Sequence, residues 1–140
     1  MVEFSWLALL LMVPLVYLML TVFEVQRAAY AVEAATREAG RAFVTSEDGA
    51  DPDQRALAAA QIAAGDQGVT LTRDQVRVTC EQEPCLTPGA TVEVRIAVRV
   101  PLPYLPKILF GREPASVAVR ATHVEVVDAY RDAPREDGDP

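Results

Sequence analysis

Residues 4–23 form an uncharged run of 20 residues, F-S-W-L-A-L-L-L-M-V-P-L-V-Y-L-M-L-T-V-F. A helix needs about 20 apolar residues to cross roughly 30 Å of hydrocarbon. A secretory signal peptide instead has a basic start, an apolar core of about 7–15 residues and a small-residue cleavage site, whereas this run is longer and follows Glu3. A buried core helix is disfavoured, because little chain is left to surround it. The run therefore predicts a transmembrane helix over residues 1–24.

No helix-breaking residue follows this run at once, so the helix is expected to continue over residues 25–44. Alanine and arginine, both strong helix formers, are frequent there. Apolar residues recur at the i, i+3, i+4 spacing of one helix face: Val25, Ala28, Ala29, Val32, Ala35, Ala39 and Phe43. The small side chains on this face allow either close packing within the same domain or docking onto a neighbouring helix.

The rest of the chain predicts a small α+β domain over residues 25–127. Asp51 before Pro52 is a helix start, because aspartate caps a helix and proline suits its first position. A short second helix is expected over 52–64, followed by three strands at about 70–80, 91–100 and 115–127. Short connections favour an antiparallel sheet. The apolar positions of the third strand change phase near Thr122 and His123, which predicts a β-bulge, and the acidic tail 128–140 is expected to be disordered.

Charge and motif content argue against several function classes. Thirteen basic and 20 acidic residues give a net charge of −7, which is unfavourable for nucleic-acid binding. Nothing near the one histidine, His123, can be identified from spacing as a serine or cysteine nucleophile, and a glycine-rich phosphate loop is absent from the sequence. One histidine and two cysteines do not complete a usual zinc site. We therefore expect no enzyme, no cofactor, no metal and no small-molecule substrate.

The two cysteines and the charges around the span give opposite indications of compartment. A disulfide between Cys80 and Cys85 would close a short loop between two strands and would need an oxidising compartment; the alternative is two reduced surface thiols in a cytoplasmic domain. Arg27, Arg37 and Arg41 follow the span, so the positive-inside rule alone would place the domain in the cytoplasm. We expect the disulfide, and hence an extracytoplasmic domain.

Two further features leave alternatives open. Glu3 stands at the start of a membrane span, where a carboxylate is unfavourable unless it is paired. It is either hydrated among the headgroups or paired with a cation of another subunit. The apolar segment 102–110, L-P-Y-L-P-K-I-L-F, is either folded back on the core or a contact surface.

Several segments together resemble the TadE-like pilus-assembly proteins, which are minor pilins or pseudopilins of the tight-adherence, Flp-type system. The likeness is most specific in the first 45 residues, and the later segments are similar to actinobacterial members. The segments are Val2-Glu3-Phe4, Glu24-Val-Gln-Arg-Ala-Ala-Tyr30, Ala34-Ala-Thr-Arg-Glu-Ala-Gly-Arg41, Cys80 to Cys85, Leu86-Thr-Pro-Gly89, Val100-Pro-Leu-Pro103 and Asp128-Ala-Tyr-Arg131.

The resemblance implies a pilin-like, single-pass protein of the cell membrane that takes part in pilus assembly. Its implied partners are membrane lipid, other pilins and Tad assembly proteins, with a prepilin peptidase acting on a leader upstream of Glu3. Glu3 matches the family's glutamate and, with Phe4, is the implied assembly site, where it would neutralise the N-terminal amine of a neighbour. The sequence departs from the pattern because no basic leader or cleavage glycine precedes Glu3. The alternative function is a single-span, membrane-anchored binding module without a filament role.

Overall fold

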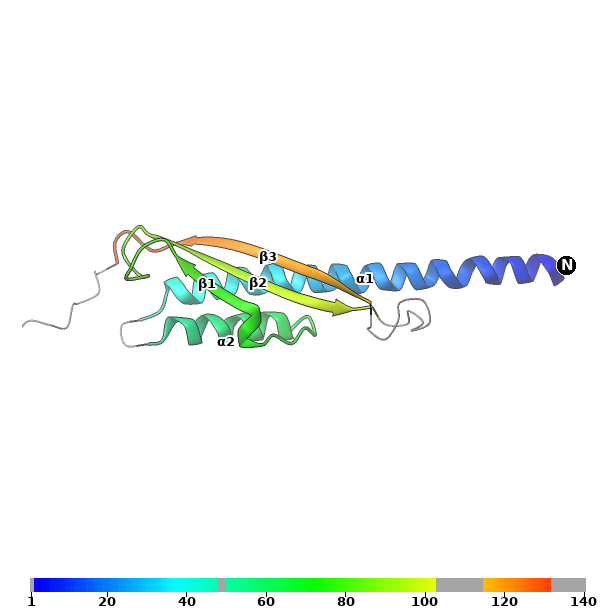
Figure 1. The fold of residues 1–140 in the computed structure, drawn as a ribbon, viewed down its shortest axis with the longest axis horizontal. Coiled ribbons are helices and arrows are strands. Elements are labelled where there is room, and N and C mark those ends of the chain that lie inside the picture. Colours follow the sequence, from blue (N-terminus) through cyan, green and yellow to red (C-terminus); the bar gives the residue numbers. More distant parts are fainter. Residues whose placement is uncertain (1, 48–49, 103–114, 132–140) are drawn as a thin grey trace, which may run out of the picture.

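The computed structural model describes residues 2–47, 50–102 and 115–131, and their side chains from Phe4 onward. It has a long N-terminal helix, a short second helix and a three-stranded antiparallel sheet, which confirms the α+β expectation (Figure 1). The elements are α1 (Val2–Val44), α2 (Pro52–Gly65), the 3₁₀ turn η1 (Arg73–Gln75), β1 (Val76–Cys80), β2 (Thr91–Pro101) and β3 (Ser116–Val126).

Helix α1 runs without a break from the apolar run into the domain. Its 43 residues correspond to about 65 Å at about 1.5 Å per residue. Pro14 lies inside the helix and does not end it. Only the C-terminal half of α1 is covered by the rest of the chain, and the N-terminal half projects beyond it (Figure 1). At the C-terminal end, the hydroxyls of Thr45 and Ser46 donate to the carbonyls of Arg41 and Ala42 at 2.8 and 2.9 Å, which satisfies two of the carbonyls that a helix end exposes.

The domain has two layers, with the sheet on one side and the two helices on the other (Figure 1). The strand order is β1-β2-β3. Alternate residues of β2 face the helices and are buried: Val92, Val94, Ile96 and Val98. Helix α2 begins as expected, because the Asp51 carboxylate accepts from the backbone nitrogens of Asp53 and Gln54 at 3.0 and 3.2 Å.

The two helices pack against each other through alanines. The buried alanines of α1 include Ala31, Ala35 and Ala39, and those of α2 are Ala56, Ala60 and Ala64. All of these except Ala31 belong to the same core cluster as the buried β2 side chains. Of the two alternatives that the sequence left open for the small-residue face of α1, packing within its own domain is therefore the one the structure shows.

The predicted β-bulge in β3 is wrong. Pairing between β2 and β3 runs without interruption from Thr91 opposite Val126 to Pro101 opposite Ser116. The apolar phase changes because His123 and Glu125 take helix-facing positions, while Val124 and Val126 point outward and are 52% and 61% exposed. The inward polar pair is tolerated because His123 Nε2 and Glu125 Oε2 satisfy each other at 2.9 Å at the edge of the core.

Two other expectations need correction. The first strand begins at Val76 rather than near residue 70, because residues 73–75 form η1, and the Thr72 amide donates to the Gln75 side chain at 3.0 Å. In the expected disordered tail, residues 128–131 are ordered: Arg131 donates to the carbonyl of Val44 at 2.8 Å and to that of Ser46. Residues 132–140 lie outside the described residues, as does the apolar segment 102–110 apart from its first residue.

Candidate functional site

The first half of α1 presents apolar side chains on all sides. From Phe4 to Phe23, nearly every side chain is exposed, with Tyr17 and Thr21 half-buried. The helix is long and apolar enough, by length and composition, to cross a membrane, and its apolar window has no residue buried inside the protein. Phe4, one of the two predicted assembly residues, is 81% exposed. The side chain of Glu3 lies outside the described part of the chain, so its pairing stays a prediction.

The domain starts directly where the apolar surface of α1 ends. Glu24 and Arg27 form an ion pair at 2.7 Å, and Ala28, within the next turn, is already buried in the core. A hollow of about 410 Å³ lies at this junction, between α1, Gly68 and the end of β2. Gly68 has a φ of +72°, and a Cβ there would come within 3.1 Å of the Arg27 guanidinium. Gly68 and the end of β2 therefore lie directly beside α1 at the point where its apolar segment ends.

The far end of the domain carries the disulfide predicted between Cys80 and Cys85. The two residues are bonded, with their Cα atoms 5.2 Å apart, so the alternative of two free thiols is wrong. Both cysteines are half-buried against the core. The Glu81 amide continues the ladder by donating to the Thr91 carbonyl at 3.0 Å, and the Gly89 amide donates to Val127 at 3.1 Å. For so short a loop, we expect stabilisation at the low end of about 2–4 kcal/mol.

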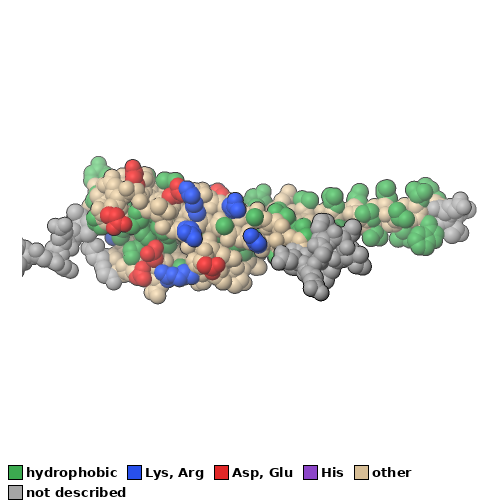
Figure 2. Space-filling model, viewed as in Figure 1, with side chains coloured by type: hydrophobic (Ala, Val, Ile, Leu, Met, Phe, Trp, Pro, Cys, Tyr) green, Lys and Arg blue, Asp and Glu red, His purple; other side chains and the backbone are tan. Residues whose placement is uncertain are grey.

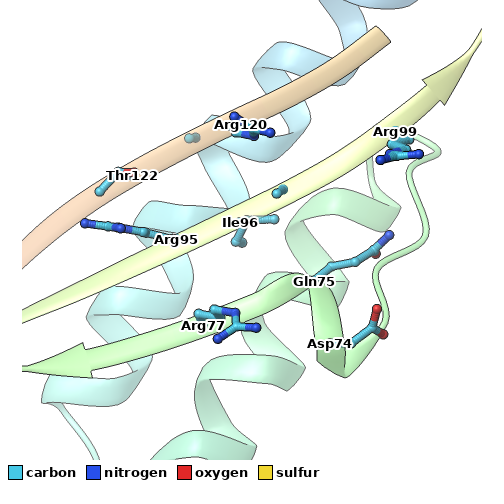
Figure 3. A pocket seen from close by; sticks show the side chains of 10 residues that line it. Asp74, Gln75, Arg77, Arg95, Ile96, Arg99, Arg120 and Thr122 are labelled. Carbon is cyan, nitrogen blue, oxygen red and sulfur yellow. The ribbon is translucent and has the colours of Figure 1, made fainter. Parts of the chain in front are cut away.

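The outer face of the sheet carries four arginines that the sequence analysis did not single out. We call Arg77, Arg95, Arg99 and Arg120 the arginine face. They come from all three strands and point away from the helices, because residues alternate between the two faces of a strand (Figure 3). Together with Asp74, Gln75, Thr122 and other residues, they line a shallow hollow of about 510 Å³. Ala97, which is exposed between Arg95 and Arg99, leaves room for this hollow.

The arginine face concentrates positive charge on an acidic chain. Arg77 and Arg95 are direct cross-strand partners, and like charges in this position are destabilising. Arg95 forms an ion pair with Glu93. For Arg77, Arg99 and Arg120, the structure shows no ion pair among the described residues. Uncompensated guanidinium groups around a hollow are suited to binding carboxylates or phosphates.

The only histidine of the chain, His123, forms an ion pair or hydrogen bond with Glu125 and is not part of a larger cluster of polar groups among the described residues. His123 and Glu125 are each one-third exposed and lie above Gly40 of α1. Within the described ranges, no group of three histidine, cysteine or acidic residues could hold a metal ion.

No protein-family model, curated protein or solved structure matches this chain significantly. The functional argument therefore depends on the apolar helix, the disulfide-closed end and the arginine face.

Proposed function

We propose that this chain is a membrane-anchored, non-enzymatic structural subunit of the minor pilin or pseudopilin type, which takes part in assembly of a Tad/Flp-type pilus. Residues 4–23 would lie in the membrane, and the α+β domain would lie outside the cytoplasm. Other pilins, Tad assembly proteins and membrane lipid would be its partners.

The continuity of α1 is the observation that carries this proposal. One helix has an exposed apolar half and a half that forms part of the domain core. The buried residue Ala28 follows the last apolar residue of the run, Phe23, within two turns. Such an anchor has no flexible linker, so packing of the anchor against neighbouring helices would also fix the position and orientation of the domain. That property suits a subunit of an ordered assembly better than an independent tethered module.

The disulfide supports the extracytoplasmic orientation. Structural disulfides form and persist in oxidising compartments and are rare in the cytoplasm. Cys80 and Cys85 lie at the end of the domain that is far from the apolar helix (Figure 1). We give the disulfide more weight than the arginines after the span, because thiols are kept reduced in the cytoplasm, whereas the positive-inside rule has exceptions.

The predicted role of Glu3 provides the test. Glu3→Ala should leave the protein in the membrane fraction and remove it from filaments sheared off the cells, because the carboxylate would no longer neutralise a neighbour's N-terminal amine. Thr21→Ala is the matched control: the Thr21 hydroxyl donates only within its own helix, to the Tyr17 carbonyl at 3.0 Å. Incorporation of Glu3→Ala at the level of the unaltered protein would contradict the role.

The arginine face is also compatible with the alternative of a single-span binding module without a filament role, which would use this face for a different acidic partner. A single cysteine introduced at Ala34, which is exposed on the ectodomain part of α1, separates the two functions in native membranes. A pilin-like subunit should give oxidative adducts with other copies or with other pilins. Adducts confined to unrelated proteins would favour the binding module.

A further inference from the structure

We propose that the arginine face docks the acidic end of a second copy of this chain. The acidic end consists of Glu81, Glu83 and Asp128, at the end of the sheet that is far from the apolar helix. This inference rests on the proposed function, since it names the surface through which neighbouring subunits would meet.

The first argument is the positive charge of the arginine face, in which only Arg95 has an ion pair among the described residues. Four guanidinium groups surround one hollow of about 510 Å³, although the chain has seven more acidic than basic residues. Arg77 and Arg95 face each other across two strands, an arrangement that lowers the stability of an isolated sheet. A partner with carboxylates would relieve this repulsion and form charge-assisted hydrogen bonds.

The second argument is that the chain itself carries a complementary surface. Glu81 and Glu83 are exposed in the loop closed by the disulfide. Asp128 is exposed directly after Val127, to whose carbonyl the Gly89 amide donates. The loop is held in place by the disulfide and by the hydrogen bond from the Thr91 hydroxyl to Glu81 at 2.5 Å. Figure 2 shows basic side chains across the middle of the domain, with acidic side chains both among them and toward the end away from the apolar helix.

The third argument concerns geometry. Arg120 pairs with Ala97 of β2, and the Glu81 amide donates to the Thr91 carbonyl at the start of β2. Arg120 and Glu81 are therefore six residues apart along β2, which is about 20 Å at about 3.3 Å per residue. One molecule therefore cannot bring its own Glu81 to its own Arg120. A contact between these two different surfaces is heterologous and needs an axial offset between the two copies, so it repeats as an open filament where the rotation does not close a ring. Parallel copies anchored at the same depth in one membrane cannot make this contact, whereas copies displaced along the axis of a filament can.

Carbodiimide cross-linking of filaments sheared off the cells tests this contact with the full chain. The reagent joins an amine to a carboxylate in direct contact, and the only lysine of the chain is Lys107. In a Lys107→Arg background, Arg120→Lys introduces one amine into the arginine face and keeps its charge. We expect a covalent dimer whose linked peptides join position 120 to Glu81, Glu83 or Asp128. The dimer should be lost when these three residues are changed to Gln, Gln and Asn.

Arg55→Lys in the same background is the matched control, because Arg55 is exposed on α2, away from the sheet; it should give no such dimer. Absence of the dimer for Arg120→Lys, or links only to other carboxylates or to other proteins, would overturn the inference. The Ala34 cysteine distinguishes this failure from failure of the proposed function. If cysteine adducts with other copies or with other pilins form without the carbodiimide dimer, only the docking surface is wrong; if neither these adducts nor the dimer form, both proposals are wrong.

Discussion

Gly40 lowers the stability of α1 through its poor helix propensity, although the surrounding side chains do not require a glycine there. It is buried in α1 below the sheet, with an ordinary helical conformation. A Cβ atom there would lie 3.5 Å from Glu125 Cβ, 3.6 Å from His123 Cδ2 and 3.8 Å from Val94 Cγ2. These are ordinary van der Waals distances, so the space above Gly40 can accept a methyl group.

Gly40→Ala should therefore stabilise the protein. Alanine has a higher helix propensity than glycine by about 0.8–1 kcal/mol, and we expect the free energy of unfolding to rise by about 0.5–1 kcal/mol. Denaturant unfolding of the full chain in detergent, followed by circular dichroism, measures the change. Gly68→Ala is the control: its φ of +72° and the 3.1 Å approach to Arg27 should make that variant less stable. Loss of stability in Gly40→Ala would contradict the conclusion that the space above Gly40 accepts a methyl group.

At the level of elements, the pair α1 and α2 depends on small side chains. Ala60 of α2 is fully buried, whereas Ala58, two residues before it, is exposed. Because successive turns of α2 place alanine against α1, the two helices have no room for a larger side chain between them.

Ala60→Leu should lower the free energy of unfolding by about 1–3 kcal/mol, the usual effect of overpacking. Ala58→Leu makes the same chemical change on the exposed side of α2 and should change stability by less than about 0.5 kcal/mol. Thermal unfolding of both variants in the same detergent provides the comparison. Equal effects in the two variants would contradict close alanine packing between the helices.

The elements that the sequence predicted well are those that local patterns determine. The second helix begins at Pro52 after the Asp51 cap, and β2 follows the alternation of residues 91–100. The β-bulge was wrongly predicted because the apolar pattern of β3 does not reveal that His123 and Glu125 face the helices as a pair. Such a pair can be recognised only when the strand register and the neighbouring helix are known.

The disulfide could also be predicted from local sequence, whereas the arginine face depends on how the strands pair. Cys80 and Cys85 are close in sequence, so their pairing could be predicted without a fold. The arginines are spread over residues 77–120, and the local alternation of β2 places only Arg95 and Arg99 on one face. That Arg77 faces Arg95 follows from the β1–β2 register, which the sequence analysis did not establish.

At the scale of the whole molecule, the apolar half of α1 and the domain are joined by one helix but share no core. The described buried residues begin at Ala28, and the apolar window of α1 contributes none of them. A chain that starts at Glu24 should therefore fold into the same domain and be soluble without detergent. Fraying of its new N-terminal turn should lower the free energy of unfolding by no more than about 1 kcal/mol. Aggregation or loss of the Cys80–Cys85 disulfide in this chain would contradict the separation.

The same truncated chain should be monomeric, even if the arginine face docks a second copy. Ion pairs between exposed groups contribute only about 0.2–1 kcal/mol each, which is too little to overcome the entropy lost when two free domains associate. In the proposed filament, packing of the α1 helices would hold neighbouring copies together at a fixed axial offset, so the same weak contacts would become effective there. Sedimentation of the chain from Glu24 should show one monomeric species. A dimer that persists at high salt would show instead that the domains associate through an apolar surface.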